Sequence, residues 1–341
     1  MAIERVKKAI EALKRGEIII MIDDEDRENE GDLVYASTFS TPEKVNFLAT
    51  YGKGLICVAL SEEIAERFEL VPMVSKNTSS YETAFTISVD AKEATTGISA
   101  IERDMTIKIL ADPLGKAEDL VRPGHIFPLI AKNGGTLRRT GHTEGSVDLC
   151  RLAGLQESAV ICEIMKDDGE MARRKDLLEF AEKYNLRVVY ISDIVEYRLQ
   201  NERLISLMEQ NEIEMFGVRV KRYLFKDHLN RLHTAIQFYS KHSIANVKFH
   251  HVGLDVDLLT NSKKYSSLVR SIEYLKQNGG VLVFLDSSNP QENNIREFGI
   301  GAQILKELGV NQIRLITSQS KEIGFIGIHG FSLDVVEEIA I

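Results

Sequence analysis

The chain has 341 residues, of which 44% are hydrophobic and 27% are charged, a composition typical of globular domains and sufficient for two of them. The formal net charge of −9 argues against a nucleic-acid surface. No run approaches the roughly 18 apolar residues of a membrane span, and the N-terminus is typical of an amphipathic helix instead of a secretion signal. We therefore expect a cytoplasmic protein that binds neither nucleic acid nor membrane.

The cysteines are Cys57, Cys150 and Cys162, all in the first half of the chain. No two of them form a Cys-x-x-Cys pair, and their neighbours are apolar, so we interpret them as reduced, buried thiols. Residues 163–341 contain no cysteine.

The first half mixes predicted helices and strands. Residues 3–15 place apolar side chains on one helical face, and residues 17–22 form a short apolar strand. Residues 112–124 hold two Pro and two Gly and are expected to form a loop that ends at His125. Further strands are expected at residues 33–39, 54–60, 84–89, 160–165 and 187–191, and further helices at 141–154 and 173–185.

A polar helix from residue 192 to about 208 is expected to connect two domains, 1–200 and 201–341. Beyond it we expect strands at 216–225, 232–239, 281–285 and 313–317, and helices at 263–278 and 294–308. Neither half shows strict βαβ alternation, so the predicted fold class is α+β. We expect a mixed-sheet α/β/α-type domain followed by a second α+β domain.

An acidic run from Asp23 to Asp32 follows the first predicted strand. A solvated charged loop is the ordinary interpretation of such a run. This one begins where a strand ends, the usual place of active-site loops, and it includes Arg27. Carboxylate oxygens suit a hard cation such as Mg²⁺. The run therefore predicts a magnesium site.

Residues 138–144 lie at the start of a predicted helix. Free N–H groups and the helix dipole favour an anion there. Arg139 adds a planar guanidinium and Thr143 a hydroxyl, the usual groups that bind phosphate. A capped helix with surface arginines is the alternative, but the position of His142 between these donors favours a ligand role.

His125 and Glu163 are the candidate proton carriers. A lone His after Pro-Gly is more often structural. Glu163 lies in an apolar strand, where a carboxylate is costly unless it has a partner. A buried acid of this kind suits proton transfer near neutral pH.

Together these segments identify residues 1–200 as similar to 3,4-dihydroxy-2-butanone 4-phosphate synthase of riboflavin biosynthesis. The matching strings are DDEDRENEGD at 23–32, TTGISA at 95–100, RPGHIFPL at 122–129, RTGHTE at 139–144 and CEIM at 162–165. The family usually has Asp-Arg after the GISA segment, whereas this chain has Glu102-Arg103 there.

The resemblance implies that D-ribulose 5-phosphate is converted to L-3,4-dihydroxy-2-butanone 4-phosphate and formate by a homodimer that uses Mg²⁺. Because a His is a less usual ligand for Mg²⁺ than oxygen, we also expect Mn²⁺ to substitute. By matching position, Glu28 and His142 correspond to the metal ligands, and His125 and Glu163 to the groups required for catalysis. The residues that correspond to the substrate site are Arg27, Glu28, Asp32, Arg139, Thr140, Gly141, His142, Thr143 and Glu163.

The second half resembles GTP cyclohydrolase II at residues 216–218, 298–305, 308–310 and 313–317. That family holds a catalytic zinc with three cysteines, and none occurs here, so we expect no zinc and an inactive domain. His250 and His251 are adjacent on a strand and face opposite sides, which favours a structural interpretation. A bifunctional enzyme that also hydrolyses GTP is the alternative. A metal- and phosphate-binding regulator without catalysis is a third hypothesis.

Overall fold

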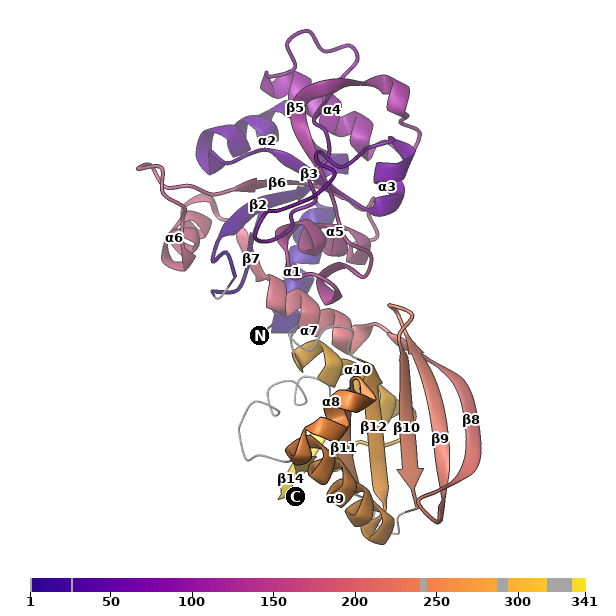
Figure 1. Cartoon of the computed structure of the whole chain (residues 1–341). Helices are drawn as coiled ribbons and strands as arrows, with labels where there is room; N and C mark the ends of the chain where they lie inside the picture. Colours follow the sequence, from indigo (N-terminus) through magenta and orange to yellow (C-terminus); the bar gives the residue numbers. More distant parts are fainter. Residues whose placement is uncertain (1, 26, 240–243, 287–293, 318–332) are drawn as a thin grey trace. The chain divides into compact units, whose positions relative to one another are not determined.

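The computed structural model describes residues 2–25, 27–239, 244–286, 294–317 and 333–341, with residues 294–298 described by their backbone alone. It divides into two compact units, Met1–Tyr197 and Arg198–Ile341 (Figure 1). Asp26 of the acidic run lies outside the described residues, as do residues 287–292. The resemblance to GTP cyclohydrolase II implies that residues 286–292 stand where that family has an Arg- and Gly-rich nucleotide segment, and this expectation falls largely on those residues.

A seven-stranded mixed sheet, in the order β4-β5-β3-β6-β2-β1-β7, forms the centre of the first unit. Its strands are β1 (Ile19–Ile22), β2 (Gly31–Ala36), β3 (Cys57–Leu60), β4 (Val89–Ala91), β5 (Leu120–Ile130), β6 (Ser158–Glu163) and β7 (Arg187–Tyr190). The helices are α1 (Ala2–Lys14), α2 (Pro42–Phe47), α3 (Glu62–Arg67), α4 (Ala100–Ala111), α5 (His142–Leu152), α6 (Arg174–Tyr184) and α7 (Ile191–Asn201), which crosses into the second unit.

Helices cover both faces of this sheet. Since successive residues of a strand point to opposite faces, neighbouring residues belong to different buried clusters. Ile20 belongs to a buried cluster with Leu177 of α6, and α2, α3 and α4 contribute to the same cluster. Its neighbour Met21 belongs to a second cluster with Leu13 of α1 and Leu149 of α5. The predicted three-layer α/β/α domain is confirmed.

The loop predicted over residues 112–124 is wrong from residue 120 onward, because β5 begins there. β5 pairs in parallel with β3 and antiparallel with β4, and a register shift lies between Val89 and Asp90. Pro123 and Gly124 lie in a bulge of β5, because the partners of β4 jump from Val121 to Ile126 and β3 pairs only from Phe127 onward. His125 therefore lies within a strand and not at a loop end.

The second unit is built on another seven-stranded mixed sheet, in the order β14-β13-β11-β12-β10-β9-β8. Its strands are β8 (Ile205–Met215), β9 (Val218–Asp227), β10 (Leu232–Phe238), β11 (Ala245–Val252), β12 (Gly280–Asp286), β13 (Gln312–Thr317) and β14 (Asp334–Ala340), and its helices are α8 (Asp255–Thr260), α9 (Ser262–Asn278) and α10 (Asn294–Glu307). Leu275 of α9 packs in a cluster with Ile236 and Leu282 of the sheet. The predicted second domain of mixed helices and strands is confirmed.

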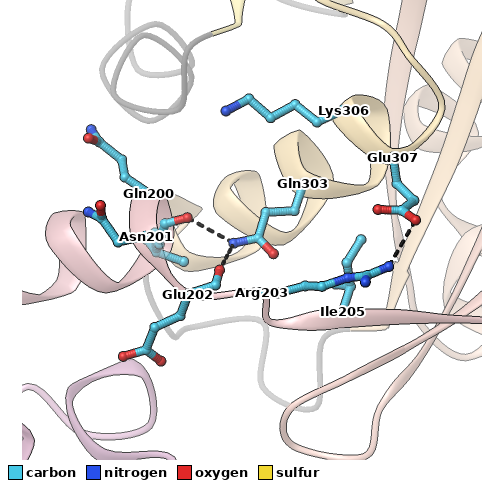
Figure 2. Close-up of a pocket in the computed structure, with 9 residues that line it drawn as sticks. Gln200, Asn201, Glu202, Arg203, Ile205, Gln303, Lys306 and Glu307 are labelled. Carbon is cyan, nitrogen blue, oxygen red and sulfur yellow. Dashed lines mark hydrogen bonds and ion pairs between the residues drawn. The ribbon is translucent and has the colours of Figure 1, made fainter. Parts of the chain in front are cut away.

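The helix predicted from residue 192 to 208 is too long, since α7 ends at residue 201 and β8 follows. Figure 2 shows Gln303 of α10 at this point: its side-chain nitrogen donates to the carbonyls of Leu199 and Glu202, at 2.8 Å each. Its oxygen accepts from the backbone N–H of Leu204 at 2.9 Å. Leu199, Glu202 and Gln303 border a surface cavity of about 320 Å³. β8 escapes prediction because it is an edge strand whose side chains are mostly exposed.

Among the described residues, no helix combines the length and apolarity that a bilayer crossing requires.

Candidate active site

The acidic loop between β1 and β2 is organised by Asp23, whose side chain is completely buried. Its Oδ1 accepts the backbone N–H of Glu30 at 2.8 Å. Its Oδ2 accepts the backbone N–H of Glu28 at 3.1 Å and the Arg27 guanidinium at 2.8 Å. One carboxylate thus replaces the sheet hydrogen bonds that the loop lacks and sets the path of the chain through residue 28.

Glu28, Asp32 and His142 converge from that loop, from β2 and from the first turn of α5. The Glu28 carboxylate lies 3.7 Å from Nδ1 of His142, and Asp32 Oδ1 lies 4.0 Å from its Nε2. Burial alone would lower the pKa of His142, but Asp32 and Glu28 raise it to about 9. Burial raises the pKa of Asp32 to about 7, against the opposing effect of His142. The cluster is therefore crowded, buried and rich in negative charge.

These residues fit a divalent cation. Asp23, Glu28 and His142 each offer a ligand-type atom, and these atoms lie within 4.8 Å of one another. The Asp23 oxygens already accept three hydrogen bonds, which leaves Glu28 and His142 as the better ligands. Nε2 of His142 and Oδ1 of Asp32 are buried without a hydrogen-bond partner among the described residues. Burying a polar atom without a hydrogen bond costs free energy, and a bound cation with its water ligands would give these two atoms partners.

Glu163 is the last residue of β6 and lies directly opposite Asp32 in the sheet. Its Oε2 accepts the backbone N–H of Leu55 at 2.9 Å. Glu163 also contributes to the raised pKa values of Asp32 and Glu30, so its charge acts directly on the cluster. Its side chain is half-buried, in contrast to the enclosed position that its apolar sequence neighbours predict.

The segment expected to hold phosphate lies beside this cluster. Gly141 is the N-cap of α5, so the N–H groups of His142 and Thr143 belong to the first turn of the helix. Arg139 donates to Glu144 at 2.6 Å and, through two nitrogens, to the carbonyl of Tyr81. The Arg139 guanidinium is thus largely engaged by protein acceptors, which leaves the helix N-terminus as the main free donor set.

Tyr81 belongs to an exposed stretch, residues 71–82, that contains several apolar side chains. Its hydroxyl donates to the carbonyl of Arg27 at 2.7 Å, and the Arg27 guanidinium lies 5.1 Å from the centre of its ring. Together with its contact to Arg139, this places one tyrosine between the acidic loop and the start of α5.

His125 stands apart from these residues. In the sheet order, β5 is separated from β2 by β3 and β6, which is about 14 Å at the usual strand spacing. The His125 side chain is 44% exposed, and its Nδ1 lies 2.7 Å from Asp90 Oδ2. The structure thus brings Arg27, Glu28, Asp32, His142 and Glu163 together within one chain and leaves His125 outside that group.

Comparison with known proteins decides the family. The family model described as 3,4-dihydroxy-2-butanone 4-phosphate synthase matches residues 7–197, more than half of the chain. The chain belongs to this family.

A synthase from Sulfurospirillum multivorans is 59% identical over 98% of this chain and 94% of its own length, and one from Campylobacter jejuni is 52% identical over 97% of each. RibBX, a two-domain 3,4-dihydroxy-2-butanone 4-phosphate synthase from A. baumannii, superposes with a TM-score of 0.84 and 36% identity over 99% of this chain and 100% of its own. A further synthase structure, in complex with two magnesium ions, covers 58% of this chain and 97% of its own, with a TM-score of 0.56 and 38% identity.

A model of GTP cyclohydrolase II matches residues 286–340. Riboflavin biosynthesis protein RibBA from Bacillus velezensis is 41% identical over 98% of this chain and 92% of its own. The chain is therefore an enzyme of riboflavin biosynthesis, a 3,4-dihydroxy-2-butanone 4-phosphate synthase with a second domain that resembles GTP cyclohydrolase II.

Sequence reasoning missed three groups that shape this synthase site: the organising role of Asp23, the link through Tyr81 and the partner of His125, Asp90. Asp90 carried a usable signal. It is an acid between Val89 and Ala91, directly after the strand predicted over residues 84–89, and apolar neighbours of this kind drew attention to Glu163.

Proposed function

We propose that this synthase converts D-ribulose 5-phosphate to L-3,4-dihydroxy-2-butanone 4-phosphate and formate with Mg²⁺ bound by Glu28 and His142. The observation that carries the proposal is the convergence of Glu28, Asp32 and His142, with two buried polar atoms that have no protein partner among the described residues. When bound, Mg²⁺ supplies Lewis-acid polarisation of substrate oxygens. Mn²⁺ can replace it, because an imidazole is a less usual ligand for Mg²⁺ than an oxygen atom.

The protein's own groups have separate roles in this proposal. The N–H groups at the start of α5 and the Thr143 hydroxyl bind the phosphate and fix the substrate. Arg139 keeps that turn in place through Glu144 and adds positive charge. Thr140 and Gly141 shape the turn, and the substrate-binding set also includes Arg27, Glu28, Asp32, His142 and Glu163.

Glu163 and His125 carry protons in the reaction. Glu163 lies opposite Asp32, beside the cluster, and is held by the N–H of Leu55. We expect His125→Ala and Glu163→Ala each to lower kcat by about 10²–10⁴-fold, the usual contribution of acid–base catalysis, with an unchanged thermal unfolding temperature. Formate release from D-ribulose 5-phosphate with Mg²⁺ measures this. A protein that produces no formate would instead support the regulator hypothesis.

The active enzyme is proposed to be a homodimer in which His125 of one subunit serves the cluster of the other. The distance between β5 and β2 within one chain and the exposure of His125 support this arrangement. Unfolding and refolding a mixture of His125→Ala and Glu163→Ala chains tests it. If each site uses both subunits, half of the dimers are mixed and each has one intact site, which restores about a quarter of native activity. If both residues act from the same chain, the mixture stays inactive.

The second domain, residues 201–341, is proposed not to hydrolyse GTP. A hydrolytic site of the GTP cyclohydrolase II type needs a metal-activated water, and this part of the sequence has no cysteine to hold zinc. The match over residues 286–340 is the one observation that favours the bifunctional alternative. Zinc content and formate release from GTP separate the two, since zinc together with GTP turnover would establish the alternative.

A further inference from the structure

Asp90 and His125 form a close pair at the junction of β4 and β5. Asp90 is buried, and its Oδ2 lies 2.7 Å from Nδ1 of His125. Its other oxygen, Oδ1, accepts the backbone N–H of the same histidine at 2.8 Å. One carboxylate therefore holds both the main chain and the ring of His125. Because a carboxylate only accepts hydrogen bonds, the pair places the ring proton on Nδ1 and leaves Nε2 with a free lone pair.

Gly97 closes over this pair. Its φ of +77° favours glycine, and a Cβ at this position would lie 2.0 Å from Asp90 Oδ2 and 2.6 Å from His125 Nδ1. No larger residue fits without displacing the carboxylate or the ring. The close approach of this backbone also keeps water away from the contact between the two side chains.

Glu102 holds the segment that contains Gly97. Its carboxylate accepts the N–H of Thr95 at 2.6 Å, the Thr95 hydroxyl at 2.7 Å and the N–H of Gly97 at 3.0 Å. These hydrogen bonds, led by Thr95, lower the pKa of Glu102 to about 2, so it stays ionised. Glu102 is the third residue of α4, and the N-cap of this helix is Ser99. Residues 95–99 therefore cover the contact between Asp90 and His125, and Glu102 connects this segment to α4.

We propose that Asp90 is a positioning residue that sets the tautomer of His125, with Gly97 and Glu102 keeping the pair closed. This rests on the proposed role of His125 as a proton carrier. Nε2 takes a proton from the substrate, the ring becomes an imidazolium, and the Asp90 carboxylate stabilises that charge. The same proton leaves from Nε2 later in the cycle, so Asp90 itself gains none.

Asp90→Asn tests the proposal, because it keeps the shape and reverses one hydrogen bond. The amide oxygen stays on the His125 N–H, so the amide NH₂ faces Nδ1 and forces the ring proton onto Nε2. In the full-length protein labelled with ¹⁵N-histidine, the His125 ring signals, assigned by their loss in His125→Gln, should change from the Nδ1–H to the Nε2–H pattern. We expect kcat to fall by about 10²–10⁴-fold with KM nearly unchanged.

The matched control is Glu93→Gln, an acid-to-amide change at an exposed position three residues along the chain. It should leave the ring signals and kcat as they are. Combining Asp90→Asn with His125→Ala should cost no more than His125→Ala alone, because Asp90 acts through the histidine.

Three results would overturn the proposal, and they differ in what else they affect. Native kcat in Asp90→Asn, while His125→Ala is inactive, removes the positioning role and leaves the proposed function intact. Loss of kcat with the Nδ1–H pattern retained shows a structural effect only. Native kcat in His125→Ala removes the role of the histidine and the inference with it.

Discussion

The substitution Asp23→Asn tests how far Asp23 holds the acidic loop in place, separately from the proposed metal ligands Glu28 and His142. The substitution keeps the shape of a buried side chain and the hydrogen bond from Glu30 to Oδ1. It replaces Oδ2, which accepts from Arg27 at 2.8 Å and from Glu28 at 3.1 Å, with a nitrogen that donates. Both donors then face another donor, and the backbone at Glu28 loses its anchor.

The size of the effect follows from these two contacts. A charge-assisted hydrogen bond contributes about 2 kcal/mol and one from a backbone N–H about 1 kcal/mol, so roughly 3 kcal/mol of loop ordering is lost. The ion pair between Arg27 and Glu28, at 2.8 Å, remains and offsets part of this. We expect Mg²⁺ to bind about 10–100-fold more weakly, the usual effect of removing a group that supports a metal ligand.

Isothermal titration calorimetry with Mg²⁺ measures the affinity, and the Mg²⁺ dependence of kcat gives an independent value. The matched control is Glu25→Gln, which removes one negative charge from the same loop. Glu25 is exposed and pairs with Arg174 at the surface, so its loss should change the affinity by less than about threefold. Native affinity in Asp23→Asn, or an equal loss in Glu25→Gln, would refute the reasoning.

Three further outcomes are expected. Thr143→Val removes one hydroxyl with little change in volume and should raise the KM for D-ribulose 5-phosphate about 10-fold or more. Thr143→Ser keeps the hydroxyl, so its KM should stay near the native value. Equal KM values in the two variants would contradict a contact between Thr143 and the phosphate. Gly54→Ala places a Cβ 2.5 Å from Glu163 Oε2 and should lower kcat at least about 10-fold, while Gly253→Ala, with no atom within 4 Å, should not. Burial would raise the pKa of Asp227, but hydrogen bonds from His233 and Arg231 lower it well below its usual range. The Asp227 carboxylate therefore contributes fully to stability above about pH 4, and this contribution is lost as the pH falls further. We expect Asp227→Asn to be less stable than the native protein at pH 7 and to show a smaller decrease in unfolding temperature on acidification. Parallel profiles of unfolding temperature against pH for the two proteins would exclude this.

Local chemistry in the sequence was a sound guide where the residues of a site are close together in the chain. The acidic loop follows β1 directly, and the first turn of α5 begins at His142, as the patterns of carboxylates and of helix-start residues predict. Their convergence followed from the family resemblance, because nothing in spacing alone brings Glu28 to His142.

Sequence reasoning failed where pairing with distant strands decides the structure. Pro123 and Gly124 favour a loop locally, and they do leave the ladder as a bulge, but the residues on either side of them pair with β3 and β4 and make the segment part of β5. β8 shows apolar alternation only near its end, at Ile213 and Met215, because the other side chains of this edge strand are mostly exposed. Asp90 gains its partner only when β4 lies beside β5, so its role is invisible until the sheet is formed.

Tyr81 makes the acidic loop and the start of α5 depend on one exposed segment. A protease that cuts between Ser79 and Ser80 would remove no strand from the sheet. It would, however, weaken the contacts of Tyr81 with both Arg27 and Arg139. During limited digestion, activity should therefore disappear before the fold does, and bound sugar phosphate should slow the cut.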